Sequence, residues 1–498
     1  MADGYARATG RVSVASVTSG PGFTQIIMAL VIGVRSKMPV VVFAGEALLA
    51  MPYHDQYIDQ AHIALATGAH FVPVRVMDRI FSDVREAFYV ARTERRPVVM
   101  GVPEDFQKQP FSYAGAYVPS TAIQPVRQYP LPDPNVVDRI VDIIREAQRP
   151  IIVGGRGSIV SCAGPALRGL AEQCGAVLAT TLLGKGLFDV DEFGIGIAGG
   201  YATDLARELF AAADLVIGCG AGLGHYTTDV GRLYPSARVI QIDVNPRGLW
   251  EGLRIADLHL QADGKLGVEA VIERLRARGI ASSGWRTAAL AQRIASEPVD
   301  GKEFPARPGV VDPRKVLIEL DRAIPKDWDI ICGGAHFTDF VAPHLRNRSP
   351  ERYHFITGFG AIGSALSEAI GIATTRNNGK VLLLEGDGSL LMHIQELETI
   401  KRHGLKLLVC AMNDGAYGAE VHKFRALGMN PRESTHGHGD LAAIAKGFGL
   451  RGAKINELGQ AGKLLEDYGR DPTATLWDIH LDGSIPSPFY RRRFYGEQ

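Results

Sequence analysis

The sequence has little cysteine for its length and no excess of charge of either sign. Its 498 residues include five cysteines, which are scattered and never form a Cys-x-x-Cys pair. An odd number of dispersed cysteines argues against a disulfide framework or a zinc site, so we expect a reducing, cytoplasmic environment. Lysine plus arginine and aspartate plus glutamate both number 54, so the formal net charge is +0. This balance argues against a nucleic-acid partner or a polybasic membrane surface.

Long apolar runs are also lacking. No stretch approaches the roughly 18 apolar residues that a membrane-spanning helix requires. The N-terminus shows no charged segment followed by an apolar one, so we expect neither a membrane span nor a signal peptide. The sequence does contain 57 glycines and 46% hydrophobic residues, which is typical of a globular protein with many tight backbone turns.

Short apolar runs alternate with helical segments along the whole chain. Such alternation predicts an α/β fold with parallel sheets. One of the helical segments is predicted at 80–92, just before the strand predicted at 98–102. The strands are predicted at 12–18, 40–44, 98–102, 150–155, 177–181, 214–218, 238–243, 329–334, 381–384, 407–412 and 475–479.

Two irregular segments divide the chain into three such units. The first holds six prolines between Lys108 and Pro134, and the second runs from about Ser282 to Pro313. Proline-rich segments without periodicity are typical of interdomain linkers. We therefore predict three doubly wound parallel-sheet domains and two linkers, at residues 1–110, 111–134 (linker), 135–282, 283–313 (linker) and 314–498.

One segment combines a buried strand with a glycine-rich acidic turn. The strand from Val381 is followed by Gly386-Asp387-Gly388-Ser389, and the residues from Leu390 to Arg402 indicate a helix. Ligands of open α/β sheets bind beyond the carboxyl ends of the strands. Flanking glycines let backbone amides approach an anion, while the Asp387 carboxylate can hold a hard cation such as Mg²⁺. Taken alone, the motif more often marks an ordinary tight turn.

A second acidic turn follows the next strand. The strand at 407–412 ends in Asn413-Asp414-Gly415-Ala416-Tyr417-Gly418, and Asp414 lies 27 positions after Asp387. That spacing fits one strand–helix–strand unit with a turn at His403-Gly404, which brings both acidic turns to the same sheet edge. The pair therefore predicts a site for a metal ion and a phosphate group.

This pairing resembles the cofactor motif of thiamine diphosphate (ThDP) enzymes of the acetolactate synthase and pyruvate decarboxylase group. The runs 2–10, 18–22, 357–363 and 440–445 are similar to other segments of that family, so the resemblance covers nearly the whole chain. It implies a pyrimidine-binding, a central and a diphosphate-binding domain, with ThDP and Mg²⁺ as cofactors. It also implies a homodimer or homotetramer whose active sites lie between domains of two subunits.

The resemblance also assigns roles to individual residues. Asp387, Asp414 and the carbonyl of Ala416 match the magnesium ligands. Because the family usually has Asn where Asp414 stands, a register with Asn413 as the ligand is the alternative. Ile362 matches the apolar residue that holds the cofactor in its bent conformation. The other cofactor contacts implied are Pro21, Gly22, Ala335, His336, Gly386, Gly388, Ser389, Tyr417 and Gly418.

One residue that the resemblance implies is absent from the sequence. In the family, a glutamate that activates the cofactor shortly precedes the segment matching Met1–Tyr5, and Glu46 is not at a position used for that role. We therefore expect an N-terminally truncated, incomplete first domain that binds cofactor poorly and exposes apolar surface. The alternative is a non-catalytic ThDP-binding relative or a regulatory subunit.

The implied chemistry is decarboxylation of a 2-oxo acid, followed by release of an aldehyde or by addition to a second carbonyl. Glu420 resembles a pocket acid of the decarboxylase branch, and His54 lies in a loop where the family places substrate-facing groups; solvated positions are the alternative for both. Flavin-binding members carry Gly-Ala-Arg where this chain has Gly220-Ala221-Gly222, so we do not expect FAD.

The leading hypothesis is therefore an acetolactate synthase-like carboligase or decarboxylase. An aromatic or branched 2-oxo acid decarboxylase is the alternative within the same family. A nicotinamide-dependent dehydrogenase is disfavoured because no Gly-x-Gly-x-x-Gly follows the first predicted strand.

Overall fold

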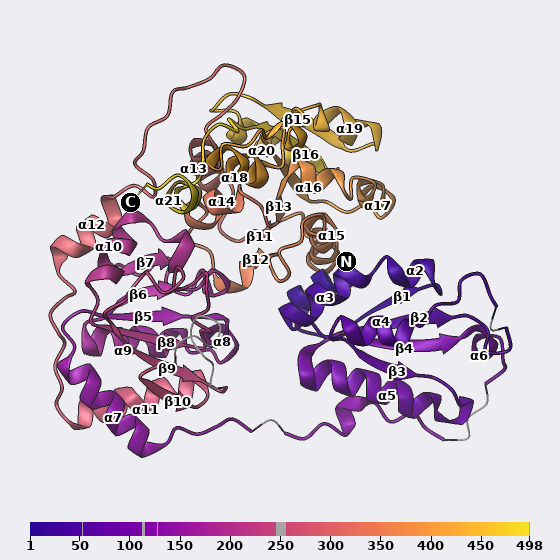
Figure 1. Cartoon of the computed structure of the whole chain (residues 1–498), viewed down its shortest axis with the longest axis horizontal. Coiled ribbons are helices and arrows are strands. Elements are labelled where there is room, and N and C mark those ends of the chain that lie inside the picture. The colour runs from indigo at the N-terminus through magenta and orange to yellow at the C-terminus, as the bar shows by residue number, and fades with distance from the viewer. Residues whose placement is uncertain (52, 112–114, 127, 246–254, 498) are drawn as a thin grey trace.

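Three separate sheets organise the chain in the computed structural model, which describes residues 1–51, 53–111, 115–126, 128–245 and 255–497. Every strand pair within these sheets is parallel. Helices cover both faces of each sheet (Figure 1), and two apolar clusters fill the two faces of each domain. The predicted fold class, three α/β domains with parallel sheets, is confirmed.

The first sheet has four strands in the order β1-β2-β4-β3, whereas the other two sheets have six. Strand β1 lies at an edge, and its Val14 is 59% exposed. The strands are β1 (Ser13–Val17), β2 (Val40–Glu46), β3 (His70–Pro73) and β4 (Val98–Pro103). The helices are α1 (Ala2–Thr9), α2 (Pro21–Thr24), α3 (Ile27–Ser36), α4 (Gln60–Ala66), α5 (Ile80–Val90) and α6 (Glu104–Gln107).

The central sheet has the order β10-β9-β8-β5-β6-β7, so the direction of winding reverses between β5 and β8. Its strands are β5 (Pro150–Gly154), β6 (Val177–Thr180), β7 (Gly194–Ile197), β8 (Leu215–Cys219), β9 (Arg238–Asp243) and β10 (Leu258–Gln261). The accompanying helices are α7 (Pro134–Glu146), α8 (Arg156–Val160), α9 (Gly164–Cys174), α10 (Asp204–Ala212) and α11 (Gly264–Ala277).

The sequence analysis predicted that the segment after the central domain is irregular, but part of this segment is helical. It contains α12 (Ala288–Ser296), which the Thr287 side chain caps by accepting a hydrogen bond from the Leu290 amide. Leu290 and Ala291 are buried in the apolar cluster on one face of the central sheet. The prediction of irregular structure was wrong here because a short amphipathic helix packs on an existing core. The domain boundaries themselves stay predictions.

The third sheet has the order β12-β11-β13-β14-β16-β15. The predicted helix at 390–402 is divided into α16 and α17. The strands are β11 (Asp329–Cys332), β12 (Tyr353–Phe355), β13 (Val381–Gly386), β14 (Leu408–Asn413), β15 (Arg451–Ile455) and β16 (Thr475–His480). The helices are α13 (Pro313–Ala323), α14 (Thr338–His344), α15 (Ala365–Arg376), α16 (Asp387–Leu391), α17 (Glu396–Arg402), α18 (Gly418–Ala426), α19 (Leu441–Gly447), α20 (Ala461–Arg470) and α21 (Pro488–Phe494).

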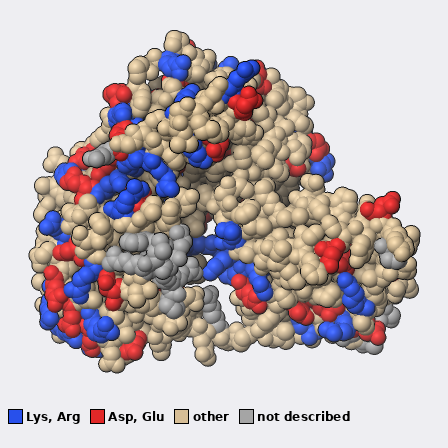
Figure 2. Space-filling view, in the orientation of Figure 1, with Lys and Arg blue, Asp and Glu red and all other residues tan. Residues whose placement is uncertain are grey.

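The first domain packs on the third through α1 and α15 (Figure 1). The two helix backbones touch, because a Cβ on Gly4 would lie 2.1 Å from the Glu368 carbonyl oxygen. Arg7 Nε donates to Glu368 Oε2 at 3.0 Å across the same contact. Arg156 of the central domain donates from Nη1 to the Ser36 carbonyl at 2.7 Å, and Figure 2 shows basic side chains gathered where these domains meet.

No helix within the described ranges is both long and apolar enough to cross a membrane.

Candidate functional site

The acidic turns after β13 and β14 meet at one edge of the third sheet. The two strands are parallel neighbours with Gly386 opposite Met412, and Asp387 and Asp414 are the first residues after them. The Gly415 amide donates to Asp387 Oδ2 at 3.0 Å, which ties the second turn to the first. The spacing of the two motifs correctly predicts this juxtaposition, whereas the role of the residues as metal ligands stays a prediction.

Burial changes the proton affinity of both carboxylates. Burial raises the pKa of Asp387 to about 6, and His436, whose Nε2 lies 3.7 Å from Asp387 Oδ2, opposes this shift. Burial, and then the charge of Asp387, raises the pKa of Asp414 to about 8. No lysine or arginine in the described part of the chain forms an ion pair with either carboxylate. A divalent cation between them would therefore supply the missing positive charge.

The choice between Asn413 and Asp414 follows from where their side chains lie. Asn413 is buried, and its Nδ2 donates to Asp478 Oδ1 at 2.7 Å and to the His438 carbonyl at 2.8 Å. Its amide is thus engaged inside the sheet. Asp414 instead lines the cavity beside Asp387, so the geometry favours Asp414 as the oxygen ligand.

A cavity of about 660 Å³ extends from these turns. No group of three or more His, Cys, Asp or Glu side chains able to share a metal ion occurs among the described residues, so a cation here also needs backbone or ligand oxygens. The Ala416 carbonyl is such a group. The predicted residues that line this cavity are Ala335, His336, Ile362, Gly386, Asp387, Gly388, Ser389, Asp414, Ala416, Tyr417, Gly418 and Glu420.

Two of the predicted glycines are required by close packing. A Cβ on Gly388 would lie 2.7 Å from Tyr417 Cε1, and one on Gly418 would lie 2.1 Å from Asp414 Oδ2. Both glycines stand at the start of short helices. Backbone amides at helix starts favour an anionic group such as phosphate.

Gly418→Ala should displace the Asp414 carboxylate and weaken Mg²⁺-dependent ThDP binding by roughly tenfold or more, the effect expected when the support of a metal ligand is lost. Binding is measured by the shift in thermal midpoint on titration with ThDP and Mg²⁺. Gly447→Ala is the control, because nothing lies within 4 Å of a Cβ at that helical position. Equal affinities of the two variants would contradict the proposed role of Asp414.

The Ser389 side chain makes two hydrogen bonds within the fold. Its hydroxyl donates to Glu385 Oε1 at 2.6 Å and accepts from the Gly363 amide at 2.8 Å. The side chain therefore holds the loop that carries Ile362 against β13. The hydroxyl proton of Ser389 is thus engaged by Glu385 and is not available to a ligand in the cavity.

Three predicted residues lie apart from this cavity. His54 lines a second cavity of about 760 Å³ at the edge of the first sheet, together with Glu46 and Gln56. Pro21 and Gly22 line neither cavity, although Thr18, which Gly22 contacts, lines the second. Within one chain the structure therefore does not bring His54 or the first-domain cofactor contacts together with Asp387 and Asp414.

Glu420 lines the cavity that contains Asp387 and Asp414. Its side chain is half exposed and pairs with Lys423 Nζ at 2.9 Å, which also lines the cavity. Glu420 is thus both a solvated helix residue and part of the cavity lining, which are the two alternatives that the sequence analysis left open.

No sequence motif marked the opposite wall of the cavity. This wall comes from α21 and its surroundings, which include Asp339, Tyr201, Tyr226, Phe489 and Tyr490. A Cβ on Gly200 would lie 2.7 Å from Phe489 Cδ2, so the central domain leaves room for the Phe489 ring. Arg35 is the cavity residue contributed by the first domain, and its guanidinium lies 5.2 Å from the Phe359 ring centre.

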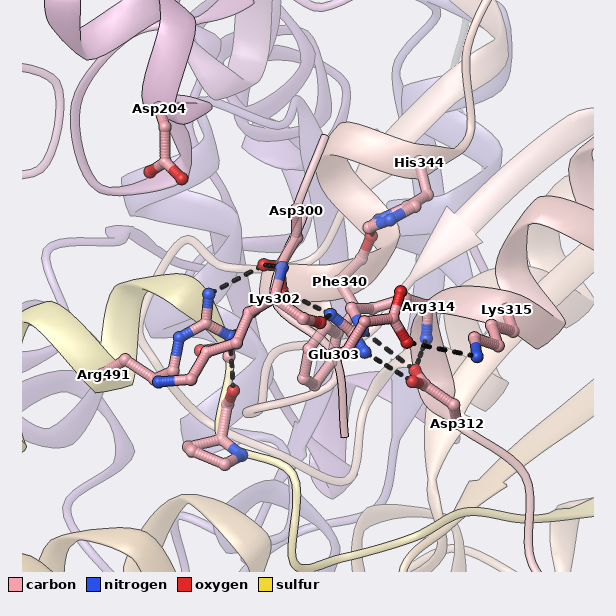
Figure 3. Close-up of polar contacts among 12 residues, drawn as sticks. Asp204, Asp300, Lys302, Glu303, Asp312, Arg314, Lys315, Phe340, His344 and Arg491 are labelled. Carbon is pink, nitrogen blue, oxygen red and sulfur yellow. Dashed lines mark hydrogen bonds and ion pairs between the residues drawn. The ribbon is translucent and has the colours of Figure 1, made fainter. Parts of the chain in front are cut away.

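Helix α21 is held in place by a buried ion-pair network (Figure 3). Arg491 donates to Asp300 with both terminal nitrogens, at 2.8 and 3.0 Å, and Arg314 Nη1 lies 3.1 Å from the same carboxylate. Asp312 binds Arg314 in turn, through Nε at 3.0 Å and Nη2 at 2.6 Å. Burial favours the protonated form of Asp300, but hydrogen bonds from Arg491 and from the Lys302 amide, together with the charges of Arg491 and Arg314, keep its pKa below the usual range.

Comparison with known proteins adds three matches along the chain. Residues 1–63 match the N-terminal TPP binding domain of thiamine pyrophosphate enzymes, residues 137–271 match their central domain, and residues 334–477 match their C-terminal TPP binding domain. The chain is 31% identical over 494 residues to the acetolactate synthase large subunit of Parasynechococcus marenigrum, covering 96% of this chain and 78% of that protein. It is 27% identical over 500 residues to the acetolactate synthase large subunit of Haemophilus influenzae, covering 97% and 86%.

Proposed function

Because the chain belongs to the thiamine pyrophosphate enzymes that include the acetolactate synthases, we propose that it decarboxylates a 2-oxo acid with ThDP and Mg²⁺. The product leaves as an aldehyde or is joined to a second carbonyl compound. The observation that carries this proposal is the meeting of Asp387 and Asp414 in one cavity, two buried carboxylates that form no ion pair with a lysine or arginine in the described part of the chain. Their oxygens suit a hard cation that also binds phosphate.

Different residues of this chain would hold the metal ion and the diphosphate group of the cofactor. Asp387, Asp414 and the Ala416 carbonyl would hold Mg²⁺, and the amides near Gly388 and Gly418 would hold the diphosphate. When bound, ThDP supplies the carbon nucleophile and the electron sink for loss of carbon dioxide.

His336 is suited to donate a hydrogen bond to the diphosphate. Its Nε2 accepts from the Ser487 amide at 2.9 Å, and burial lowers its pKa well below the usual range. A neutral imidazole with an acceptor at Nε2 carries its proton on Nδ1. His336 lines the cavity, so this proton is available to an anionic oxygen there.

We also propose that two copies of the chain complete the active site. The cavity that contains Thr18 and His54 and the cavity that contains Asp387 and Asp414 share no residue within one chain. Because the pyrimidine and diphosphate halves of one cofactor must be held together, the first-domain cavity of one copy would face the cavity of another copy that contains Asp387 and Asp414. This supports a homodimer or a homotetramer.

We propose that catalysis needs no flavin. The support comes from the central sheet, where a dinucleotide would enter between β5 and β8. The loops after these strands are in backbone contact: the Gly157 amide donates to the Gly220 carbonyl at 2.9 Å, and a Cβ on Gly155 would lie 2.3 Å from that oxygen.

The five cysteines are free, which supports a reducing compartment such as the cytoplasm.

The proposed function is tested by incubating the protein with a panel of 2-oxo acids, ThDP and Mg²⁺ and without FAD. The panel includes pyruvate and aromatic and branched acids, because Phe489 and Tyr490 line the cavity. We expect carbon dioxide release that requires both ThDP and Mg²⁺, with aldehydes or hydroxyketones as products. No release from any acid, or release that persists after the metal is chelated, would contradict the proposal.

A further inference from the structure

Asp339 is a buried carboxyl group in the wall of the cavity. It lies on α14, is 8% exposed, and lines the cavity that also contains Asp387 and Asp414. Ser487 Oγ donates to Asp339 Oδ2 at 2.7 Å. No other described residue hydrogen-bonds to the Asp339 carboxyl or forms an ion pair with it. Its second oxygen, Oδ1, is therefore left for a molecule in the cavity.

Ser487 fixes Asp339 and His336 at the same time. The Ser487 amide donates to His336 Nε2 at 2.9 Å, and the Tyr490 amide donates to Ser487 Oγ at 3.2 Å. Since Ser487 Oγ accepts from Tyr490, its own proton is directed to Asp339. Each titratable side chain is thus held at one end by Ser487, while both line the cavity.

The surroundings of Asp339 favour its protonated form. The titratable groups that face it are Cys332 on β11, Tyr201 of the central domain, and Tyr490 on α21. The nearby cation is Arg492, whose guanidinium hydrogen-bonds to the Gly200 and Ala202 carbonyls and to Asp204. Burial raises the pKa of Asp339 to about 7, against the opposing effects of Ser487 and Arg492.

We propose that Asp339 is a catalytic acid that delivers a proton to the substrate in this cavity, with Ser487 as its positioning residue. This inference rests on the proposed function. When carbon dioxide leaves a 2-oxo acid, the carbon that loses it must gain a proton for an aldehyde to form. The O–H bond of Asp339 breaks as the new C–H bond forms, Asp339 is left as a carboxylate, and water returns the proton before the next turnover. One proton is consumed for each 2-oxo acid anion converted to aldehyde and carbon dioxide.

Asp339→Asn tests the acid role with the least change in shape. The asparagine oxygen can still accept from Ser487, but the side chain has no transferable proton. We expect aldehyde formation by the holoenzyme to lose about 10²- to 10⁴-fold in kcat, the range for general acid catalysis, with KM and ThDP affinity nearly unchanged. Asp339→Glu restores an acid and should recover part of kcat. Asp78→Asn, at an exposed position, is the control and should leave kcat unchanged.

The pH profile separates an acid from a merely structural residue. Only protonated Asp339 can donate, so wild-type kcat should fall as the pH rises above about 7. Ser487→Ala removes a hydrogen bond that stabilises the ionised form, so it should move this fall to higher pH. Asp339→Asn should abolish it.

The thermal midpoint of the cofactor-free protein gives a readout that does not depend on activity. In the unfolded chain Asp339 ionises near pH 4, whereas the folded chain keeps the proton until about pH 7. The ionised form is disfavoured in the fold, so this group lowers stability progressively as the pH rises from about 4 to 7. The thermal midpoint of Asp339→Asn should therefore rise relative to wild type over this range and level off above it.

The outcomes distinguish the two proposals. An active wild type whose kcat and pH profile are unaffected by Asp339→Asn, or a thermal midpoint difference that does not change with pH, overturns the acid role and leaves the proposed function standing. Absence of turnover by the wild type on every 2-oxo acid overturns the proposed function and the acid role together.

Discussion

Asp387→Ala should weaken Mg²⁺-dependent binding of ThDP by more than about 100-fold, because loss of a metal ligand should exceed the roughly 10- to 100-fold cost of losing an outer-shell partner. The variant also removes one of the two acceptors of the Gly415 amide and leaves only Asn413 Oδ1, so the second turn loses its tie to the first. Binding is measured by the ligand-induced shift in thermal midpoint and by fluorescence quenching, each at saturating Mg²⁺.

The same variant should not lose stability when cofactor and metal are absent. Removal of one of two neighbouring buried carboxylates relieves their mutual repulsion, so the thermal midpoint of the free protein should stay the same or rise. Asp387→Asn keeps one oxygen ligand without the charge and should have an intermediate affinity. Asp327→Ala is the control, since this exposed aspartate pairs with Lys380 on the surface. An Asp387→Ala protein that binds ThDP as tightly as the control would refute the metal assignment.

Asp300→Ala should lower the free energy of unfolding by about 3–5 kcal/mol, the cost of leaving a buried charge without its partner. The carboxylate is 1% exposed and is shared by Arg491 and Arg314, so its loss leaves Arg491 with Glu497 and Arg314 with Asp312 as their remaining acidic partners. The unfolding free energy is measured by denaturant titration at pH 7.

Asp327→Ala again serves as the control, because an exposed ion pair contributes only about 0–1 kcal/mol. Since Arg491 lies on α21, Asp300→Ala should also loosen the wall that carries Phe489 and Tyr490 and raise KM for the 2-oxo acid. A cost no larger than that of the control would show that α21 is held by its apolar contacts instead.

The interior strands of the sheets were predictable, and the edge strands mostly were not. Interior strands such as β5 and β13 are buried on both faces and read as continuous apolar runs. The five strands that the sequence analysis missed, β3, β7, β10, β12 and β15, all lie at sheet edges and span three to five residues each. Partial exposure and short length leave such strands without a distinctive pattern.

In the candidate site, too, residues in local sequence motifs were predictable, whereas contacts between distant segments were not. Asp387 and Asp414 were predictable because each follows a buried strand directly and glycine marks the turn. Asp339 carries no such signal: its partner Ser487 is 148 positions away, and only tertiary packing brings them together. The ion pair of Asp300 with Arg491 spans 191 positions and was likewise out of reach.

The separation of the two cavities within one chain has a genetic consequence. In the proposed assembly, each active site combines the first-domain cavity of one subunit with the third-domain cavity of another, so each subunit contributes to two active sites. A harmful substitution at His54 and one at Asp387 would damage opposite halves. Mixed oligomers of two such defective proteins would therefore contain some active sites built from two undamaged halves, so two inactive alleles could complement each other in one cell.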